Sequence, residues 1–89
     1  MSNFTGGSAY AMVQQIAGGY VLVTERTFNR LAPGELTQLN FEIEKVLREV
    51  RGDQPALDDT DAIQKRNRKI QRLNSCRMML QSYRQRRRR

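Results

Sequence analysis

From residue 56 to residue 89 the chain contains neither glycine nor proline. Both residues interrupt helices, glycine through its backbone freedom and proline through its missing amide, so a run this long without them favours one long helix. Asp58 or Asp59 precedes the run as an N-cap, and Asp61 adds a carboxylate where the helix dipole favours negative charge. We predict a helix from about residue 59 to about residue 85, roughly 40 Å long at about 1.5 Å per residue.

A second, shorter helix is predicted before it, over about residues 34–51. Pro33 suits a first helical turn and Gly52 suits a helix end. One face of this helix is apolar at three- and four-residue spacing, and it comprises Leu36, Leu39, Ile43, Val46, Leu47 and Val50. The short loop between the helices predicts an antiparallel hairpin. In it we expect Leu39, Ile43, Val46 and Val50 to face Ile63, Ile70 and Leu73.

The N-terminal third is less regular. Residues 1–8 are small and polar and predict a disordered arm. Residues 9–19 fit a short strand or a helix, whereas residues 20–24 (YVLVT) are β-branched and aromatic and predict a strand. Residues 24–31 fit either one helical turn capped by Thr24 or more strand. The fold class is therefore mainly α: an antiparallel two-helix hairpin preceded by a short strand or β-hairpin, in one small domain over residues 9–85.

Charge divides the chain into two unequal parts. Residues 1–61 carry five basic and nine acidic side chains, whereas residues 62–89 carry eleven basic side chains and no acid. A solvated helix face usually mixes both signs, so this segment indicates a polyanionic or acidic partner. The candidate nucleic-acid-binding residues are Lys65, Arg66, Arg68, Lys69, Arg72, Arg84, Arg86, Arg87, Arg88 and Arg89. The last four, residues 86–89, are expected to form a flexible arginine tail on the basic end of the helix.

Three interpretations of this basic segment stay open. The first is a nucleic-acid-binding protein, for DNA or RNA, in a regulatory, packaging or accessory role, because Lys and Arg neutralise phosphates and release counterions. The second, from another class, is a protein-interaction or assembly subunit that docks on an acidic protein surface. The third is an inert solvated helix face. The first predicts binding to unrelated nucleic acids that falls steeply with salt.

Self-association is expected from the unequal lengths of the two helices. The longer helix overhangs the shorter one by roughly 15 Å at the same rise per residue. Met79, Leu80 and Tyr83 lie on this overhang and would be too exposed unless residues 10–31 or a second copy cover them. We therefore expect a homodimer with these three side chains at its interface.

Several functions are disfavoured by absent residues. The chain has no histidine and one cysteine, Cys76, so it lacks the usual general base and cannot supply the four ligands of a structural zinc site. We expect neither enzymatic activity nor a metal or cofactor. No apolar run approaches the roughly 20 residues of a membrane span, and residues 1–7 do not resemble a secretory signal. We expect a cytoplasmic protein, in the nucleoid or nucleus if it binds DNA.

Overall fold

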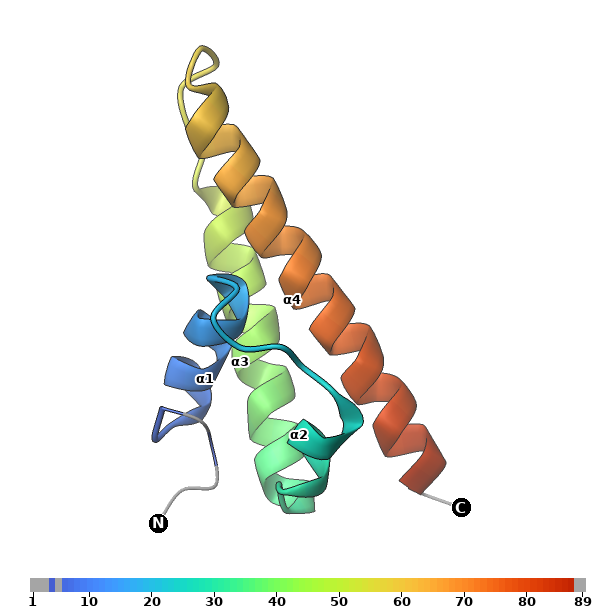
Figure 1. Ribbon diagram of the computed structural model, residues 1–89. Coiled ribbons are helices and arrows are strands. Elements are labelled where there is room, and N and C mark those ends of the chain that lie inside the picture. Colours follow the sequence, from blue (N-terminus) through green and yellow to red (C-terminus); the bar gives the residue numbers. More distant parts are fainter. Residues whose placement is uncertain (1–3, 5, 88–89) are drawn as a thin grey trace.

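The computed structural model describes residue 4 and residues 6–87. This part of the chain is mainly helical and contains four helices: α1 (Ala9–Ala17), α2 (Glu25–Asn29), α3 (Pro33–Gly52) and α4 (Thr60–Arg87) (Figure 1). It contains no strand, so the predicted short strand or β-hairpin before the helices is wrong.

The two long helices form a hairpin whose arms spread apart. Figure 1 shows α3 and α4 side by side near the loop that joins them and well separated at the opposite end, like a V. Leu39, Ile43 and Leu73 are fully buried, whereas Ile70 packs at the edge of the core. Helix α3 begins at Pro33 as expected, and α4 continues to Arg87, two residues beyond its predicted end.

Helix α1 is the helical one of the two alternatives left open for residues 9–19. Its buried side chains Ala9, Met12, Val13 and Ile16 recur at three- and four-residue spacing, which is the helical period and not the period of two that a strand requires. Ser8 caps it, because the Ser8 Oγ accepts a hydrogen bond from the Ala11 amide at 3.1 Å. Helix α1 packs against both α3 and α4, which gives its apolar face a place in the core.

The residues with the strongest strand composition form the connector between α1 and α2, residues 18–24. Val21 and Val23 pack at the edge of the core, whereas Tyr20 and Leu22 are 85% and 87% exposed. The alternation expected of a strand is therefore present. No second strand lies beside it in the described chain, so the segment stays a loop that bends at Tyr20 and Val21.

Helix α2 fills the open end of the V between α3 and the last turns of α4 (Figure 1). Residues 24–31 were predicted to form either a helical turn that begins after Thr24 or more strand, and the helical alternative is confirmed. Thr24 is the N-cap of α2 and has an extended backbone. Phe28 is completely buried, and its ring lies 5.5 Å from that of Tyr83. Tyr83 on the overhanging end of α4 is thus covered by its own chain.

The N-terminal arm also joins the core in part. Only 8% of the Phe4 side chain is exposed, although residues 1–8 were predicted to be disordered. The rest of that prediction, residues 1–3 and 5, lies outside the described residues, as do Arg88 and Arg89 at the other end.

Candidate nucleic-acid interface

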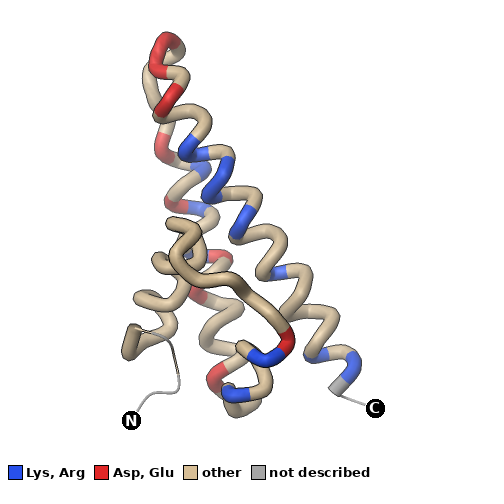
Figure 2. The backbone as a smooth tube through the Cα atoms, viewed as in Figure 1, with Lys and Arg blue, Asp and Glu red and all other residues tan. Residues whose placement is uncertain are grey.

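The basic side chains follow α4 along much of its length. Figure 2 shows Lys and Arg along α4, and Asp and Glu mainly along α3 and at the loop that joins the two helices. Helix α4 contains a single acid, Asp61, in its first turn. The helix surface is therefore positive, but the role of each cation depends on what its side chain contacts.

Arg66 caps the end of α3. Its Nε donates hydrogen bonds to the carbonyl oxygens of Val50, at 3.1 Å, and Asp53, at 2.9 Å, and its Nη2 donates to that of Arg51 at 3.0 Å. The last carbonyls of a helix have no partner within the helix and carry its partial negative charge, so a guanidinium stabilises them. Arg66 was predicted to contact nucleic acid, but its guanidinium is bound within the protein.

Arg72 serves α1 in a similar way. Its Nη1 donates to the carbonyl of Ala17, the last residue of α1, at 3.1 Å. The guanidinium also lies against Gly19, where an added Cβ would be 2.8 Å from the guanidinium carbon. Gly19 has φ of +81°, a conformation that glycine adopts without strain. Arg72 thus holds the connector onto α4 while the residue as a whole stays exposed.

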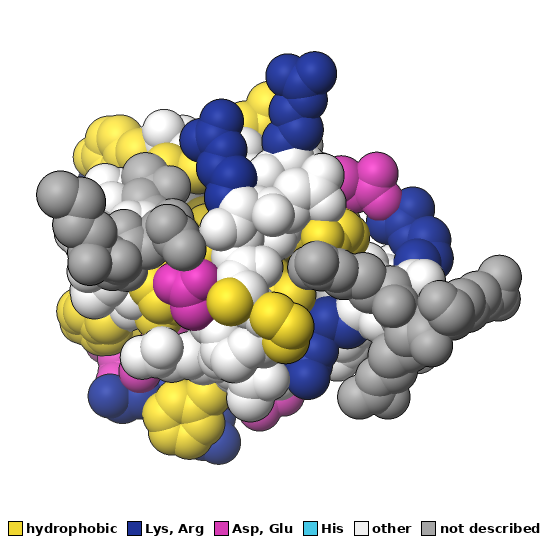
Figure 3. All heavy atoms as spheres, turned by 90° about the horizontal axis from the view of Figure 1, so that it is seen from below, with side chains coloured by type: hydrophobic (Ala, Val, Ile, Leu, Met, Phe, Trp, Pro, Cys, Tyr) yellow, Lys and Arg dark blue, Asp and Glu magenta, His cyan; other side chains and the backbone are white. Residues whose placement is uncertain are grey.

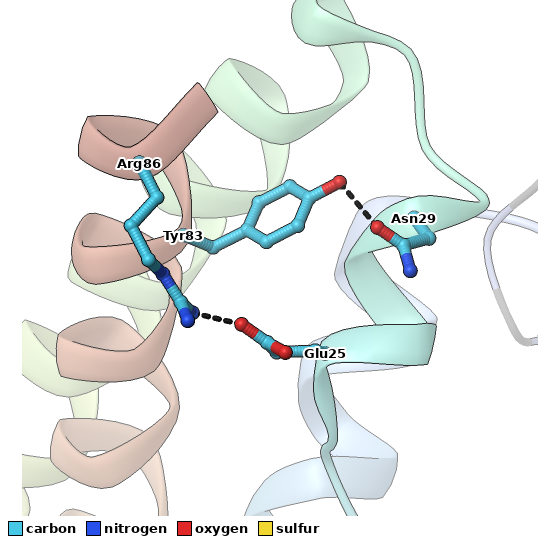
Figure 4. Close-up of polar contacts among 4 residues, drawn as sticks. All are labelled: Glu25, Asn29, Tyr83 and Arg86. Carbon is cyan, nitrogen blue, oxygen red and sulfur yellow. Dashed lines mark hydrogen bonds and ion pairs between the residues drawn. The ribbon is translucent and has the colours of Figure 1, made fainter. Parts of the chain in front are cut away.

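Two further arginines bind the chain near the open end of the V. The Nη2 of Arg84 donates to the Oγ1 of Thr37 at 3.3 Å, and Arg86 forms an ion pair with Glu25 (Figure 4). In the same close-up, the Tyr83 hydroxyl donates to the Asn29 Oδ1 at 2.6 Å. Arg86 was predicted to belong to a flexible tail, but it lies in the helix and contacts α2. The arginines that follow it fall where the structure describes no side chain.

Lys65, Arg68 and Lys69 are the predicted cations that remain available. All three are exposed, and within the described chain none makes a hydrogen bond or an ion pair. Their spacing of three and four residues places them on one side of α4. Lys65 and Lys69 border a shallow pocket that Glu49 of α3 and the following residue Asp53 also line. Arg68 is not part of that pocket.

Cations at the open end of the V are more scattered. Viewed from this end, the dark blue side chains lie at separate points, with hydrophobic side chains reaching the surface between them (Figure 3). The exposed row on the N-terminal half of α4 is therefore the more continuous basic feature among the residues that the structure describes.

The predicted interface residues divide into two groups. Leu80 is completely buried and Tyr83 is 8% exposed, so both are covered within the chain, which was one of the two arrangements expected. Met79 is 37% exposed. It borders a groove between α4 and the connector. This groove was not predicted, although the alternation of side chains in residues 20–24 was a signal for it.

This apolar groove has a volume of about 480 Å³. Its lining residues are Ile16, Gly19, Val21, Leu22, Val23, Gln71, Arg72, Ser75, Cys76 and Met79. The lining contains no acid, and its one charged residue is Arg72. The groove is thus an apolar surface beside a cation.

Side-chain chemistry in the groove offers no reactive group. Cys76 is 1% exposed, and this burial raises the pKa of its thiol from 9.0 to about 11. The thiol is therefore protonated at neutral pH, and the thiolate is the nucleophilic form. The described residues bring no three Cys, Asp or Glu side chains together as metal ligands. None of the helices described here is both long enough and apolar enough to cross a membrane.

Comparison of the chain with known protein families, with curated proteins and with solved structures yields no match. Its function is therefore argued from its own surface.

Proposed function

We propose that this protein binds nucleic acid, DNA or RNA, through the outer side of α4, without catalysis. The observation that supports the proposal best is the exposed row of Lys65, Arg68 and Lys69, on a helix that has no acid beyond its first turn. Arg72 extends the row by one turn, with Nη1 already bonded to Ala17.

The row suits phosphates better than bases. Lys and Arg that neutralise phosphates release condensed counterions, and the affinity gained in this way does not depend on sequence. Gln64, Asn67 and Gln71 are exposed on the same helix and can add hydrogen bonds to phosphates or base edges. We therefore expect affinity for unrelated sequences, in keeping with a packaging, accessory or regulatory role.

Salt dependence tests the proposal. Each phosphate contact contributes about −0.9 to the slope of log affinity against log salt concentration on duplex DNA. Replacing Lys65, Arg68 and Lys69 with Gln should therefore reduce the steepness of that slope by roughly three units. Binding is measured by fluorescence anisotropy with duplex DNA, single strands and RNA over a range of salt concentrations.

A matched control removes the same charge from another helix. Lys45, Arg48 and Arg51 are exposed on α3, and their replacement with Gln also lowers the net charge by three. If long-range charge alone drove binding, both triple variants would behave alike. Equal slopes for the two variants, or no binding of the intact protein at low salt, would refute the proposed interface.

The arginines at the C-terminus are part of the same proposal. Arg87, Arg88 and Arg89 follow the ion-paired Arg86, so removing them leaves the Arg86–Glu25 contact in place. Their deletion should flatten the salt slope further, by up to about three units, with an unchanged melting temperature.

The alternative proposal is docking on an acidic protein. It is favoured by the apolar groove beside Arg72, because protein interfaces combine a buried apolar centre with a polar rim. Such a partner would bind with a gentler salt dependence, and nucleic acid would not compete for it. Competition between the two partners therefore separates the proposals.

Self-association is the other part of the proposed behaviour. Met79 is the one predicted interface residue that remains exposed, and it borders the apolar groove together with Leu22. A homodimer or larger assembly would therefore form through this groove rather than through the buried Leu80 and Tyr83.

A further inference from the structure

The end of the V that joins α3 to α4 carries an unusual combination of side chains. We define residues 52–61 as the acidic tip; it holds Asp53, Asp58, Asp59 and Asp61 and no basic residue. Leu57 lies among these acids and is 96% exposed, more than any other large hydrophobic residue that the structure describes. The tip thus presents one apolar side chain surrounded by negative charge.

One of the four carboxylates has a structural role. The Asp59 Oδ1 accepts a hydrogen bond from the Ala62 amide at 3.1 Å, so Asp59 caps α4. The carboxylates of Asp53, Asp58 and Asp61 make no contact of this kind in the described chain. Asp53 lines the pocket that Lys65 and Lys69 border, whereas Asp58 and Asp61 follow Leu57 by one and four residues and leave two negative charges available to a partner.

The apolar groove has the complementary chemistry. Its base includes the buried side chains of Ile16 and Cys76, and the exposed Leu22 and Met79 border it. Its volume of about 480 Å³ readily accepts a leucine side chain, since pockets from roughly 300 Å³ upward hold whole small molecules. Arg72 supplies a positive charge at the groove, where no acid lies among the lining residues.

We propose that the acidic tip of one copy docks in the apolar groove of a second copy. Leu57 then lies between Leu22 and Met79, and Asp58 and Asp61 lie toward Arg72 and, one helical turn earlier, Arg68. The proposal rests on the self-association proposed above and gives it a defined pair of contacting surfaces. It shares Arg68 and Arg72 with the proposed nucleic-acid surface, so the two kinds of binding should compete at these residues.

The partner has to be another molecule because of the geometry of α4. The tip ends where α4 begins, at Thr60, and the groove lies at Cys76, about 24 Å farther along the same helix at about 1.5 Å per residue. A rigid helix keeps the tip away from its own groove. Charge favours a second copy, because the tip is negative whereas residues 62–89 contain no acid.

This contact joins two different surfaces of the same chain. Two copies can exchange tips and close into a pair, or each copy can pass its tip to the next and form a longer chain. In either arrangement, every contact requires one intact tip and one intact groove. Two variants that each lack one of these surfaces should therefore complement each other.

The test uses Leu57→Asp, which removes the apolar tip, and Leu22→Asp, which blocks the groove. Both residues are exposed, so the folded chain should tolerate each change. Burial of one leucine side chain corresponds to roughly 10- to 100-fold in affinity, so each variant should self-associate at least ~10-fold more weakly than the intact protein. Sedimentation velocity on nuclease-treated full-length protein measures this.

Mixing the two variants gives the decisive result. The Leu57→Asp copy retains its groove and the Leu22→Asp copy retains its tip, so an equimolar mixture should form a one-to-one complex that neither forms alone. Phe41→Asp is the matched control, because Phe41 is 58% exposed on α3 and is not part of the groove lining. Its self-association should equal that of the intact protein.

The charge component is tested separately. Asp58→Lys should weaken association, and Arg68→Asp in the second copy should restore part of it, because the pair of charges is exchanged. Circular dichroism shows whether each variant is folded. If Leu22→Asp is unfolded, Met79→Glu blocks the same groove from α4.

Each outcome has a defined meaning. An intact protein that is monomeric at all accessible concentrations overturns this docking and the proposed self-association together. An intact protein that self-associates equally well with either substitution overturns the docking alone and places the contact elsewhere. A mixture of the two variants that stays monomeric also overturns it.

Discussion

Replacement of Arg66 with Ala is expected to destabilise the fold rather than to weaken nucleic-acid binding directly. The change removes three hydrogen bonds from a charged group to the carbonyls of Val50, Arg51 and Asp53. Hydrogen bonds to charged groups contribute more than neutral ones, but two of these lie at exposed positions, so we expect a loss of about 2 kcal/mol in the free energy of unfolding. In a domain of this size, that loss lowers the melting temperature by roughly 8–16 °C.

Arg68 provides the matched comparison for this measurement. It lies two residues away on the same helix and is exposed without a contact of its own, so Arg68→Ala should change stability by less than about 0.5 kcal/mol. Arg66→Lys should fall between the two, because a lysine keeps the charge but cannot place two nitrogen atoms against three carbonyls. Urea unfolding followed by circular dichroism measures all three variants. Equal midpoints for Arg66→Ala and Arg68→Ala would refute the capping role.

Two other predictions concern the core. Ile43→Ala should lower the free energy of unfolding by about 2–5 kcal/mol, because Ile43 is completely buried between the helices. A melting temperature equal to that of the intact protein would contradict this packing. Phe41→Ala, at an exposed site, is the control. Burial raises the pKa of Cys76 from 9.0 to about 11, so its contribution to stability is fully present below pH 9 and is lost as the pH rises through 11. Across this pH range the free energy of unfolding should fall by about 3 kcal/mol more for the intact protein than for Cys76→Ala, as measured by urea unfolding at each pH. If the free energies of the two proteins changed in parallel with pH, the thiol would not titrate in this way.

The two long helices were predictable because their signals are local. Pro33 at the first turn and the absence of glycine and proline after residue 55 indicate where the helices form. Gly52 is the last residue of α3, although it lacks the positive φ of a left-handed helix cap. The apolar faces of Leu39, Ile43 and Leu73 follow from helical spacing alone. The positions of these helices and of their apolar faces do not depend on contacts with residues distant in the sequence.

The connector was predicted as a strand for a sound local reason but with the wrong outcome. Its β-branched and aromatic residues favour an extended backbone, and residues 20–23 do alternate between exposed and partly buried side chains. A strand also requires a neighbour, and the residues before the connector form α1, whose buried Met12, Val13 and Ile16 belong to the core where α1 packs against α3 and α4. Tertiary packing thus removed the partner that the predicted hairpin required.

The sequence by itself determines the charge of the C-terminal third, the absence of histidine and the existence of two long helices. The tertiary structure alone decided how the basic residues are used. In the sequence, Arg66, Arg68 and Arg72 are three similar arginines of one basic helix. In the structure, Arg66 and Arg72 donate hydrogen bonds to carbonyls at the C-terminal ends of α3 and α1, whereas Arg68 is exposed. The C-terminal end of a helix stabilises a cation only if the fold places that cation beside it. The local sequence does not specify which side chain of α4 lies beside the end of α3 or of α1.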